Sequence, residues 1–252
     1  MQFLMRMLEM SKIAAIMQPT FLPWLGYFSM IDQVDTFIFL DDVQFSKQSW
    51  QSRNRVSGPN GPVLLSLPVA RKPSKPLIKD TLLADRDIHA DLIARAAGSL
   101  EKAPFWGSVQ HLLEQGLNKA VRLVDVNIGL TKMIASELRL QVEFLNSSDL
   151  GVPPSGKSAR LRELCRLVGA KTYLSPVGSI GYLQEGDVFS EQDVRLRFLH
   201  FEHPIYEQRW VPFQSHMSII DGLAYVGSSG ILALIRQGIK TPLTMRQMLE
   251  EH

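Results

Sequence analysis

The sequence predicts an α/β fold, in the form of a doubly wound, mainly parallel sheet with a helical inserted subdomain. The first observation is that short apolar runs ending in polar residues alternate with amphipathic stretches in both halves of the 252-residue chain. The second is a mostly helical stretch at about 87–140, which interrupts this alternation. We therefore expect one α/β domain over residues 12–252 that contains the helical subdomain. Residues 1–11 are expected to be disordered or an extension from an upstream start codon.

The first βαβ unit is the clearest element of the chain. An apolar run from Ile13 to Met17 predicts a strand, and Gln18-Pro19 begins a turn. An amphipathic stretch to about Val34 predicts a helix. A second apolar run, Thr36 to Leu40, predicts a strand that ends on Asp41-Asp42. Because open parallel sheets bind ligands at the carboxyl ends of their strands, both polar strand ends are candidate parts of a site.

Apolar periodicity and turn residues assign the remaining elements in order. In the first half they predict a strand at 63–69, a basic loop at 70–76, a further strand at 77–83 and helices from Asp87 to Glu137. In the second half they predict strands at 141–145, 172–174 and 194–201, helices at 158–168, 218–225 and 231–235, and a Gly-rich turn at 178–182.

Composition and charge argue against several classes of protein. The chain is 45% hydrophobic and 21% charged, which is ordinary for a soluble globular protein, and its net charge of +2 favours no nucleic-acid partner. The single cysteine, Cys165, excludes an internal disulfide and lies in a helical pattern typical of a buried thiol. No metal-site pattern, signal peptide or membrane-spanning run of roughly 18 apolar residues is present in the sequence. We expect a cytoplasmic protein without a metal.

Polar side chains gather at the ends of the first two predicted strands. The Gln18 amide both donates and accepts hydrogen bonds, which favours recognition of a substrate over a local turn role. Asp41 and Asp42 alternate across their strand, so one of them is expected to face a cleft. The residues that follow are donors suited to phosphate or carboxylate, and their density favours a site over a solvated face. They are Gln44, Lys47, Trp50, Arg53 and Asn54.

The segment from Gly151 to Ser158 matches the phosphate-loop pattern G-x-x-x-x-G-K-[ST]. It nevertheless lies past the midpoint of the chain, after the acidic strand, and is separated from its own predicted strand by residues 146–150. Pro153 and Pro154 also remove N–H groups that such a loop has to donate. The competing interpretation is a helix start with Ser155 as its N-cap.

A second motif, in residues 216–221, has the residue types of a hydrolase triad. His216, Ser218 and Asp221 are close together in the chain, whereas triads are normally assembled from distant segments. Ser218 followed three residues later by Asp221 favours a variant of the helix capping box.

Several of these stretches resemble the WbqC-like protein family from about Ser11 onward. They are IMQPTFLPWLGYFSMI, DTFIFLDDVQFSKQSWQSRNR, LSLPV, GKSARLRELCRLVGAKTYLSP with GSIGYL, and HPIYEQRWVPFQSHMSIIDGLAYVG. The resemblance implies a role in bacterial surface-polysaccharide synthesis, notably of O-antigen, with transfer of an amino acid such as glycine. It also implies that the GKS stretch starts a helix. Tyr225-Val226-Gly227 departs from the more frequent apolar-Phe-Asn-Gly ending.

The opening unit also resembles, at the level of architecture, adenylylating enzymes of the HIGH nucleotidyltransferase class. Their two histidines are absent here, and Pro23-Trp24-Leu25-Gly26 stands in that region. ATP is therefore implied only by analogy of fold.

We interpret the chain as a transferase that forms an amide or ester between an amino acid or acyl group and a sugar intermediate. Its partners would be a nucleotide sugar or an amino acid. The alternatives are a non-catalytic module that binds a nucleotide sugar or a partner enzyme, and a phosphate-loop NTPase. The predicted catalytic residues are Gln18, Asp41 and Asp42, and the predicted substrate-binding set is Gln44, Lys47, Trp50, Arg53 and Asn54, joined by Tyr182 and Gln208.

Overall fold

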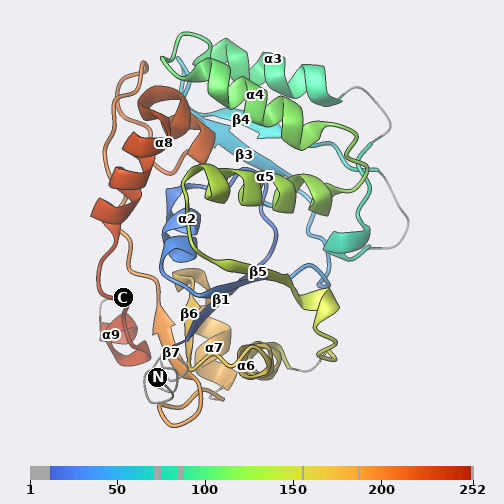
Figure 1. The fold of residues 1–252 in the computed structure, drawn as a ribbon, viewed down its shortest axis with the longest axis vertical. Coiled ribbons are helices and arrows are strands. Elements are labelled where there is room, and N and C mark those ends of the chain that lie inside the picture. Colours follow the sequence, from blue (N-terminus) through green and yellow to red (C-terminus); the bar gives the residue numbers. More distant parts are fainter. Residues whose placement is uncertain (1–11, 71–74, 85–87, 155, 187, 251–252) are drawn as a thin grey trace.

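The computed structural model describes residues 12–70, 75–84, 88–154, 156–186 and 188–250, and it confirms the predicted α/β class. Five strands form one parallel sheet in the order β5-β2-β1-β6-β7 (Figure 1). The predicted segment 1–11 lies outside the described residues. The strands are β1 (Ile13–Met17), β2 (Thr36–Phe39), β5 (Glu143–Asn146), β6 (Thr172–Ser175) and β7 (Arg195–Phe198).

The strand order changes direction between β1 and β6. From β1 the chain adds β2 and then β5 on one side, and it returns to add β6 and β7 on the other. In doubly wound sheets such a reversal opens a crevice at the carboxyl ends of the two central strands. The residues that follow β1 and its neighbours are therefore the first place to look for a site.

Side chains of the central strands alternate between two hydrophobic cores. Phe37 and Phe39 of β2 pack in one core, whereas Ile38 packs in the other, as the pleat of a strand buried on both faces requires. The first core is shared with α2 and α8 and the second with α6 and α7, on opposite faces of the sheet (Figure 1). These helices are α2 (Leu25–Asp32), α6 (Lys157–Leu167), α7 (Ile180–Gly186) and α8 (Ile219–Gly238).

A hairpin and three helices form a further layer, and their buried side chains belong to the first core (Figure 1). β3 (Arg53–Val56) pairs antiparallel with β4 (Val63–Ser66), and α3 packs against β4. The stretch predicted to be helical consists of α3 (Ile88–Leu100), α4 (Trp106–Leu117) and α5 (Leu123–Glu137). Asp87, where the first of these helices was expected to begin, lies outside the described residues.

Two predicted elements have a different secondary structure from the one expected. The expected strand at 77–83 is a 3₁₀ turn, Ile78–Asp80, flanked by isolated bridges that do not extend into a ladder. The expected Gly-rich turn at 178–182 is instead a 3₁₀ turn, Val177–Ser179, that continues directly into α7. Its glycines do not have positive φ, so they adopt helical conformations that any residue can take.

The two short helices expected in the C-terminal half are present as two segments of α8 that meet at a kink. α8 continues through both predicted segments, and Gly227 breaks its regular geometry with φ 68° and ψ 177°. The short α9 (Met245–Glu250) is not among the predicted elements.

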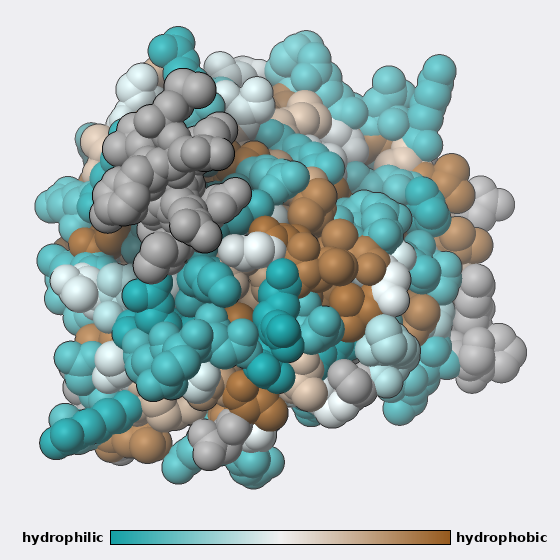
Figure 2. Space-filling view, turned by 60° about the horizontal axis from the view of Figure 1, so that its bottom comes forward, coloured by the Kyte–Doolittle hydropathy of each residue, from teal (hydrophilic) through white to brown (hydrophobic). Residues whose placement is uncertain are grey.

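α8 is also the one helix in the described part of the chain that is long and apolar enough to cross a membrane. Half of its most apolar window is buried inside the protein, and buried core helices pass the same test. Figure 2 shows a mainly hydrophilic face of the molecule, with one continuous hydrophobic patch near its centre.

Candidate functional site

The polar residues that follow β1, β2 and β5 lie along one edge of the sheet. The register places Met17 beside Phe39 and Phe39 beside Asn146, so the three strands end at the same level. The backbone N–H of Leu40 donates to the carbonyl of Met17 at 2.8 Å, which keeps the two chains together beyond the ladder. The two predicted strand ends therefore adjoin.

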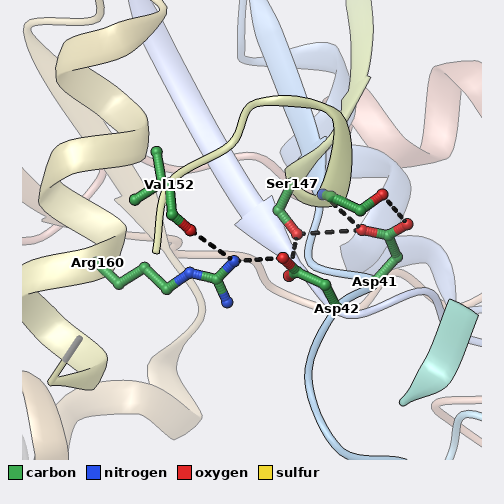
Figure 3. Close-up of polar contacts among 6 residues, drawn as sticks. Asp41, Asp42, Ser147, Val152 and Arg160 are labelled. Atoms are coloured by element: carbon green, nitrogen blue, oxygen red, sulfur yellow. Dashed lines mark hydrogen bonds and ion pairs between the residues drawn. The ribbon is translucent and has the colours of Figure 1, made fainter. Parts of the chain in front are cut away.

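Asp41 is buried and joins the end of β2 to the loop after β5. Its carboxylate accepts hydrogen bonds from the Ser147 hydroxyl at 3.1 Å, the Ser148 amide at 3.0 Å and the Ser148 hydroxyl at 2.7 Å (Figure 3). Both carboxylate oxygens are engaged within the protein, so Asp41 fixes the shape of this edge.

Asp42 is more accessible and forms an ion pair with Arg160 of α6. The Ser147 hydroxyl donates to it at 2.6 Å and the Arg160 guanidinium at 2.5 Å (Figure 3). Burial raises the pKa of Asp42, but the hydrogen bonds from Arg160 and Ser147 and the charge of Arg160 outweigh it, and the pKa lies below its ordinary value. Asp42 is therefore a carboxylate at neutral pH.

Gln18 is exposed at the end of β1 and is held by a neighbouring amide. The Gln51 amide donates to the Gln18 side-chain oxygen at 2.7 Å, and the Gln51 oxygen accepts from the Ser46 backbone at 2.9 Å. This arrangement leaves the Gln18 amide N–H groups without a partner among the described residues, which suits a group that donates to a ligand.

The turn that carries Gln18 is strained and is clamped by two buried asparagines. Leu22 has φ +44°, a conformation rare for a bulky side chain. The Asn54 amide donates to the carbonyls of Phe21 and Leu22 at 3.0 and 2.8 Å. The Asn127 amide of α5 donates to the carbonyl of Pro19 at 3.2 Å. Asn54, predicted to bind substrate, therefore holds the backbone of the turn.

Aromatic and imidazole rings cover the start of α2. The Trp24 ring is stacked on His203, with centroids 6.0 Å apart and planes within 5°, and lies 4.9 Å from His216. A Cβ at Gly26 would come within 2.3 Å of the Trp24 ring, so only glycine at that position leaves space for the indole.

The hydrogen bonds of the two histidines fix one tautomer. The backbone N–H of His216 donates to Nε2 of His203 at 3.2 Å, so Nδ1 of His203 carries a proton and donates to the Pro204 carbonyl at 2.8 Å. Burial, and next the charge of His216, lower the pKa of His203. Burial, and next the charge of Arg55, lower the pKa of His216. Both rings are neutral near pH 7.

The other predicted site residues lie in the loop after β2, at the start of the hairpin and on α7. Gln44 and Lys47 are exposed in the loop between β2 and β3, and Trp50 and Arg53 lie at the start of the hairpin. Tyr182 lies on α7, where its ring is 5.7 Å from the ammonium of Lys157.

Gln208 lies in a buried polar network and does not point to the sheet edge. Its amide donates to the Tyr206 hydroxyl, the Gln214 carbonyl and the Asp221 carboxylate at 3.2, 3.0 and 3.0 Å. The backbone N–H of Ser57 also donates to Asp221, at 2.6 Å. These bonds give Gln208 a structural task.

The two motifs that were doubted from the sequence have structural roles. Lys157 is the first residue of α6, after the edge strand β5, so the N-cap of this helix is Gly156. The expected N-cap, Ser155, lies outside the described residues. Ser218 caps α8 by accepting from the Ile220 amide at 3.4 Å, as predicted. The Asp221 carboxylate does not complete the capping box, because the Ser218 amide donates to the Arg55 carbonyl instead.

Three other features of the described residues bear on a possible site: the thiol, the metal-ligating side chains and one cavity. Cys165 is buried, and burial raises the pKa of its thiol. Over the described ranges, no three acidic, histidine or cysteine side chains are grouped to hold a metal ion. A cavity of about 340 Å³ lies away from the sheet edge, between α4, α5 and the Gly227 kink of α8, and its walls include Phe105 and Leu223.

Sequence patterns did not single out Arg160, His203 or the serines after β5 as site residues, and Arg55, although part of the cationic segment after β2, was not in the predicted substrate-binding set. For Arg55 the signal was present, because it follows Arg53 at the spacing that puts two side chains on one face of a strand.

Comparison with known proteins gives two matches. A model of the WbqC-like protein family matches residues 18–232. A Mycobacterium tuberculosis (strain ATCC 25618 / H37Rv) protein, "Uncharacterized protein Rv1507c", is 32% identical over 225 residues, which cover 86% of this chain and 95% of the relative.

Proposed function

The chain belongs to the WbqC-like protein family, and we propose that it is a transferase of bacterial surface-glycan synthesis, such as that of O-antigen. In this proposal it joins an amino acid such as glycine, or an acyl group, to a sugar intermediate through an amide or ester bond. The observation that carries the proposal is that β1 and β2 end at the same level, so that Gln18 and Asp42 both follow adjoining strand ends. We place the reaction in the cytoplasm.

The proposed reaction assigns a separate task to each group. The acceptor nitrogen or oxygen bonds to the carbonyl carbon of the activated amino acid, the bond to the leaving group breaks with its electron pair, and the acceptor loses a proton. The free amide N–H of Gln18 is suited to donate to the carbonyl oxygen. Because the pKa of Asp42 is lowered, its carboxylate is a weak base and is better suited to orient an amine. His216, which is neutral and exposed, is the better proton acceptor.

The test is to incubate the purified protein with a UDP-linked aminosugar, glycine and ATP, and to detect the glycyl product by mass spectrometry. ATP is included because the opening strand, turn and helix resemble those of adenylylating enzymes. Gln18→Ala should abolish the product without unfolding the protein, because the side chain is exposed. Gln110→Ala on α4, also a hydrogen-bonded glutamine, is the matched control. Full activity of Gln18→Ala would remove the basis of the proposal.

The second candidate is a non-catalytic protein that binds a nucleotide sugar or a partner enzyme of the same pathway. It is favoured by the engagement of both Asp41 oxygens within the protein, since a catalytic carboxylate needs a free oxygen. Saturable binding of a UDP-sugar with no product from any donor mixture would support this candidate over the transferase.

A further inference from the structure

We propose that the outer face of β3 is a binding site for a diphosphate ester, formed by Arg53, Arg55 and Trp50 and bordered by His216. This inference deepens the proposed function and rests on it for the identity of the attached sugar, because it names the group by which that sugar is carried. The name β3 site is used below for these four residues.

The two arginines share the open face of the hairpin. Asn54 and Val56 point inward and are buried, so the alternation of the strand turns Arg53 and Arg55 outward. Their partners across the ladder are Ser66 and Leu64, and Leu64 is 42% exposed. Among the described helices, the one that packs on the hairpin is α3, and it does so from the side that holds the core.

Both arginines are half-buried cations without a carboxylate partner in the described part of the chain. Three other arginines with partly or largely buried side chains do have one: Arg160, Arg162 and Arg197 lie 2.5, 2.5 and 2.7 Å from a carboxylate. Arg195, on the edge strand β7, is a further half-buried arginine for which the described residues supply no ion pair.

The Nε atom of Arg55 is itself buried without an acceptor among the described residues. An unpaired charged donor at a buried position is costly, and polar groups of this kind are usually satisfied by a ligand, ion or water. A bound anion would supply the missing acceptor.

Trp50 supplies a fixed aromatic ring next to these charges. It is 50% exposed, and the guanidinium carbon of Arg55 lies 5.2 Å from its ring centroid. The Trp50 carbonyl accepts from the Phe21 amide at 2.9 Å, which ties the loop to the turn after β1. Gln48, two residues before Trp50, and His216, whose segment is joined to β3 by the Ser218 amide donating to the Arg55 carbonyl at 2.7 Å, both have φ +58° without ending a helix. Such strained positions cluster at ligand sites.

The number and spacing of the charges favour a diphosphate. Residues two apart on a strand are roughly 6.6 Å apart, so Arg53 and Arg55 present two planar donor groups side by side. Each guanidinium matches the oxygens of one phosphate in a bidentate arrangement, whereas a single carboxylate needs only one of them. Gln51 follows Trp50 in the chain, and its amide donates to the Gln18 side chain. A sugar attached to this diphosphate would therefore lie toward the end of β1.

The experiment measures binding of three probes by isothermal titration calorimetry: UDP, inorganic pyrophosphate and farnesyl diphosphate. We expect saturable binding of at least one, weakened about tenfold or more by Arg55→Gln and by Arg53→Gln. Arg95→Gln is the matched control, because Arg95 is an exposed arginine of α3 without an ion-pair partner among the described residues. Stronger binding of UDP would identify a nucleotide ester, and stronger binding of farnesyl diphosphate a lipid ester.

A measurement on the unaltered protein covers the case in which a variant fails to fold. The bound probe should protect Arg53 and Arg55, but not Arg95, from modification by phenylglyoxal, as read by mass spectrometry. Equal modification with and without a saturating probe, or unchanged binding by both variants, would overturn the β3 site. If a diphosphate binds there and no transfer product forms, the site stands and the proposed transferase fails. If product forms and Arg55→Gln leaves the KM unchanged, the proposed transferase stands and the β3 site fails.

Discussion

Replacing Asn54 by alanine tests whether this residue supports the turn after β1 or contacts a substrate. Its side chain is 5% exposed, and its amide donates to two backbone carbonyls at 3.0 and 2.8 Å. Its oxygen also accepts from the Arg55 amide at 2.9 Å. Asn54→Ala leaves these buried groups unpaired at about 1–3 kcal/mol each when water cannot reach them. With partial relaxation we expect the free energy of unfolding to fall by about 2–4 kcal/mol.

The assay is urea unfolding at pH 7.5, followed by circular dichroism, with the slope against urea concentration compared between variants. Asn118→Ala is the matched control, because Asn118 is an exposed asparagine at the end of α4 and should change stability by less than about 0.5 kcal/mol. An Asn54→Ala protein that is as stable as the unaltered protein but inactive would contradict the clamp. It would return Asn54 to the substrate-binding residues.

Three further predictions follow from contacts elsewhere in the fold. Arg160→Met should lower the free energy of unfolding by about 3–5 kcal/mol in urea at pH 7, because it leaves the partly buried Asp42 carboxylate without its cation. The pKa of Asp42 is lowered in the folded state, so the ionised carboxylate stabilises the fold above pH about 4, and this stabilisation is lost as the pH falls through the folded pKa. Arg160→Met should make the stability depend less on pH in this range. The pKa values of His203 and His216 are also lowered, so their neutral forms stabilise the fold above pH about 6.5, and stability should decline from pH 7.5 to 5.5 as the unfolded chain gains protons. The double variant His203→Gln/His216→Gln should show a smaller decline, and an equal one would contradict the assignment. Gly227→Ala should cost about 1–3 kcal/mol, because φ is +68° and Phe105 lies 3.1 Å from the added Cβ. Gly129→Ala in α5, where the added Cβ meets nothing within 4 Å, should be neutral or stabilising in the same urea assay.

The central strands could be predicted because burial on both faces produces continuous apolar runs. The observed β1 coincides with the predicted strand, and the observed β2 ends one residue before Leu40. β3 escaped prediction because its inward face includes Asn54, whose burial depends on carbonyls of a turn more than thirty residues earlier. A polar residue that is satisfied only by tertiary contacts looks exposed in the sequence.

The site was predictable only where it follows from the rule for parallel sheets. The strand ends that carry Gln18 and Asp41 adjoin because neighbouring parallel strands end at the same level. The pairing of Asp42 with Arg160 joins residues 118 positions apart, and it depends on the packing of α6, which no local pattern contains. The approach of His203 to Trp24 likewise depends on the path of the chain after β7.

The clamp on the turn after β1 makes this part of the site a joint property of two layers. Asn54 comes from the hairpin, and Asn127 reaches the turn from α5 with hydrogen bonds to the carbonyls of Pro19 and Gln51 at 3.2 and 2.7 Å. The turn that carries Gln18 therefore keeps its shape only where both the hairpin and α5 are packed against it. A shortened protein that ends before α5 would lack this packing, and it would also lack β5 and β6, the strands that flank β2 and β1 in the sheet. The helical layer accordingly helps to hold the sheet edge in its shape.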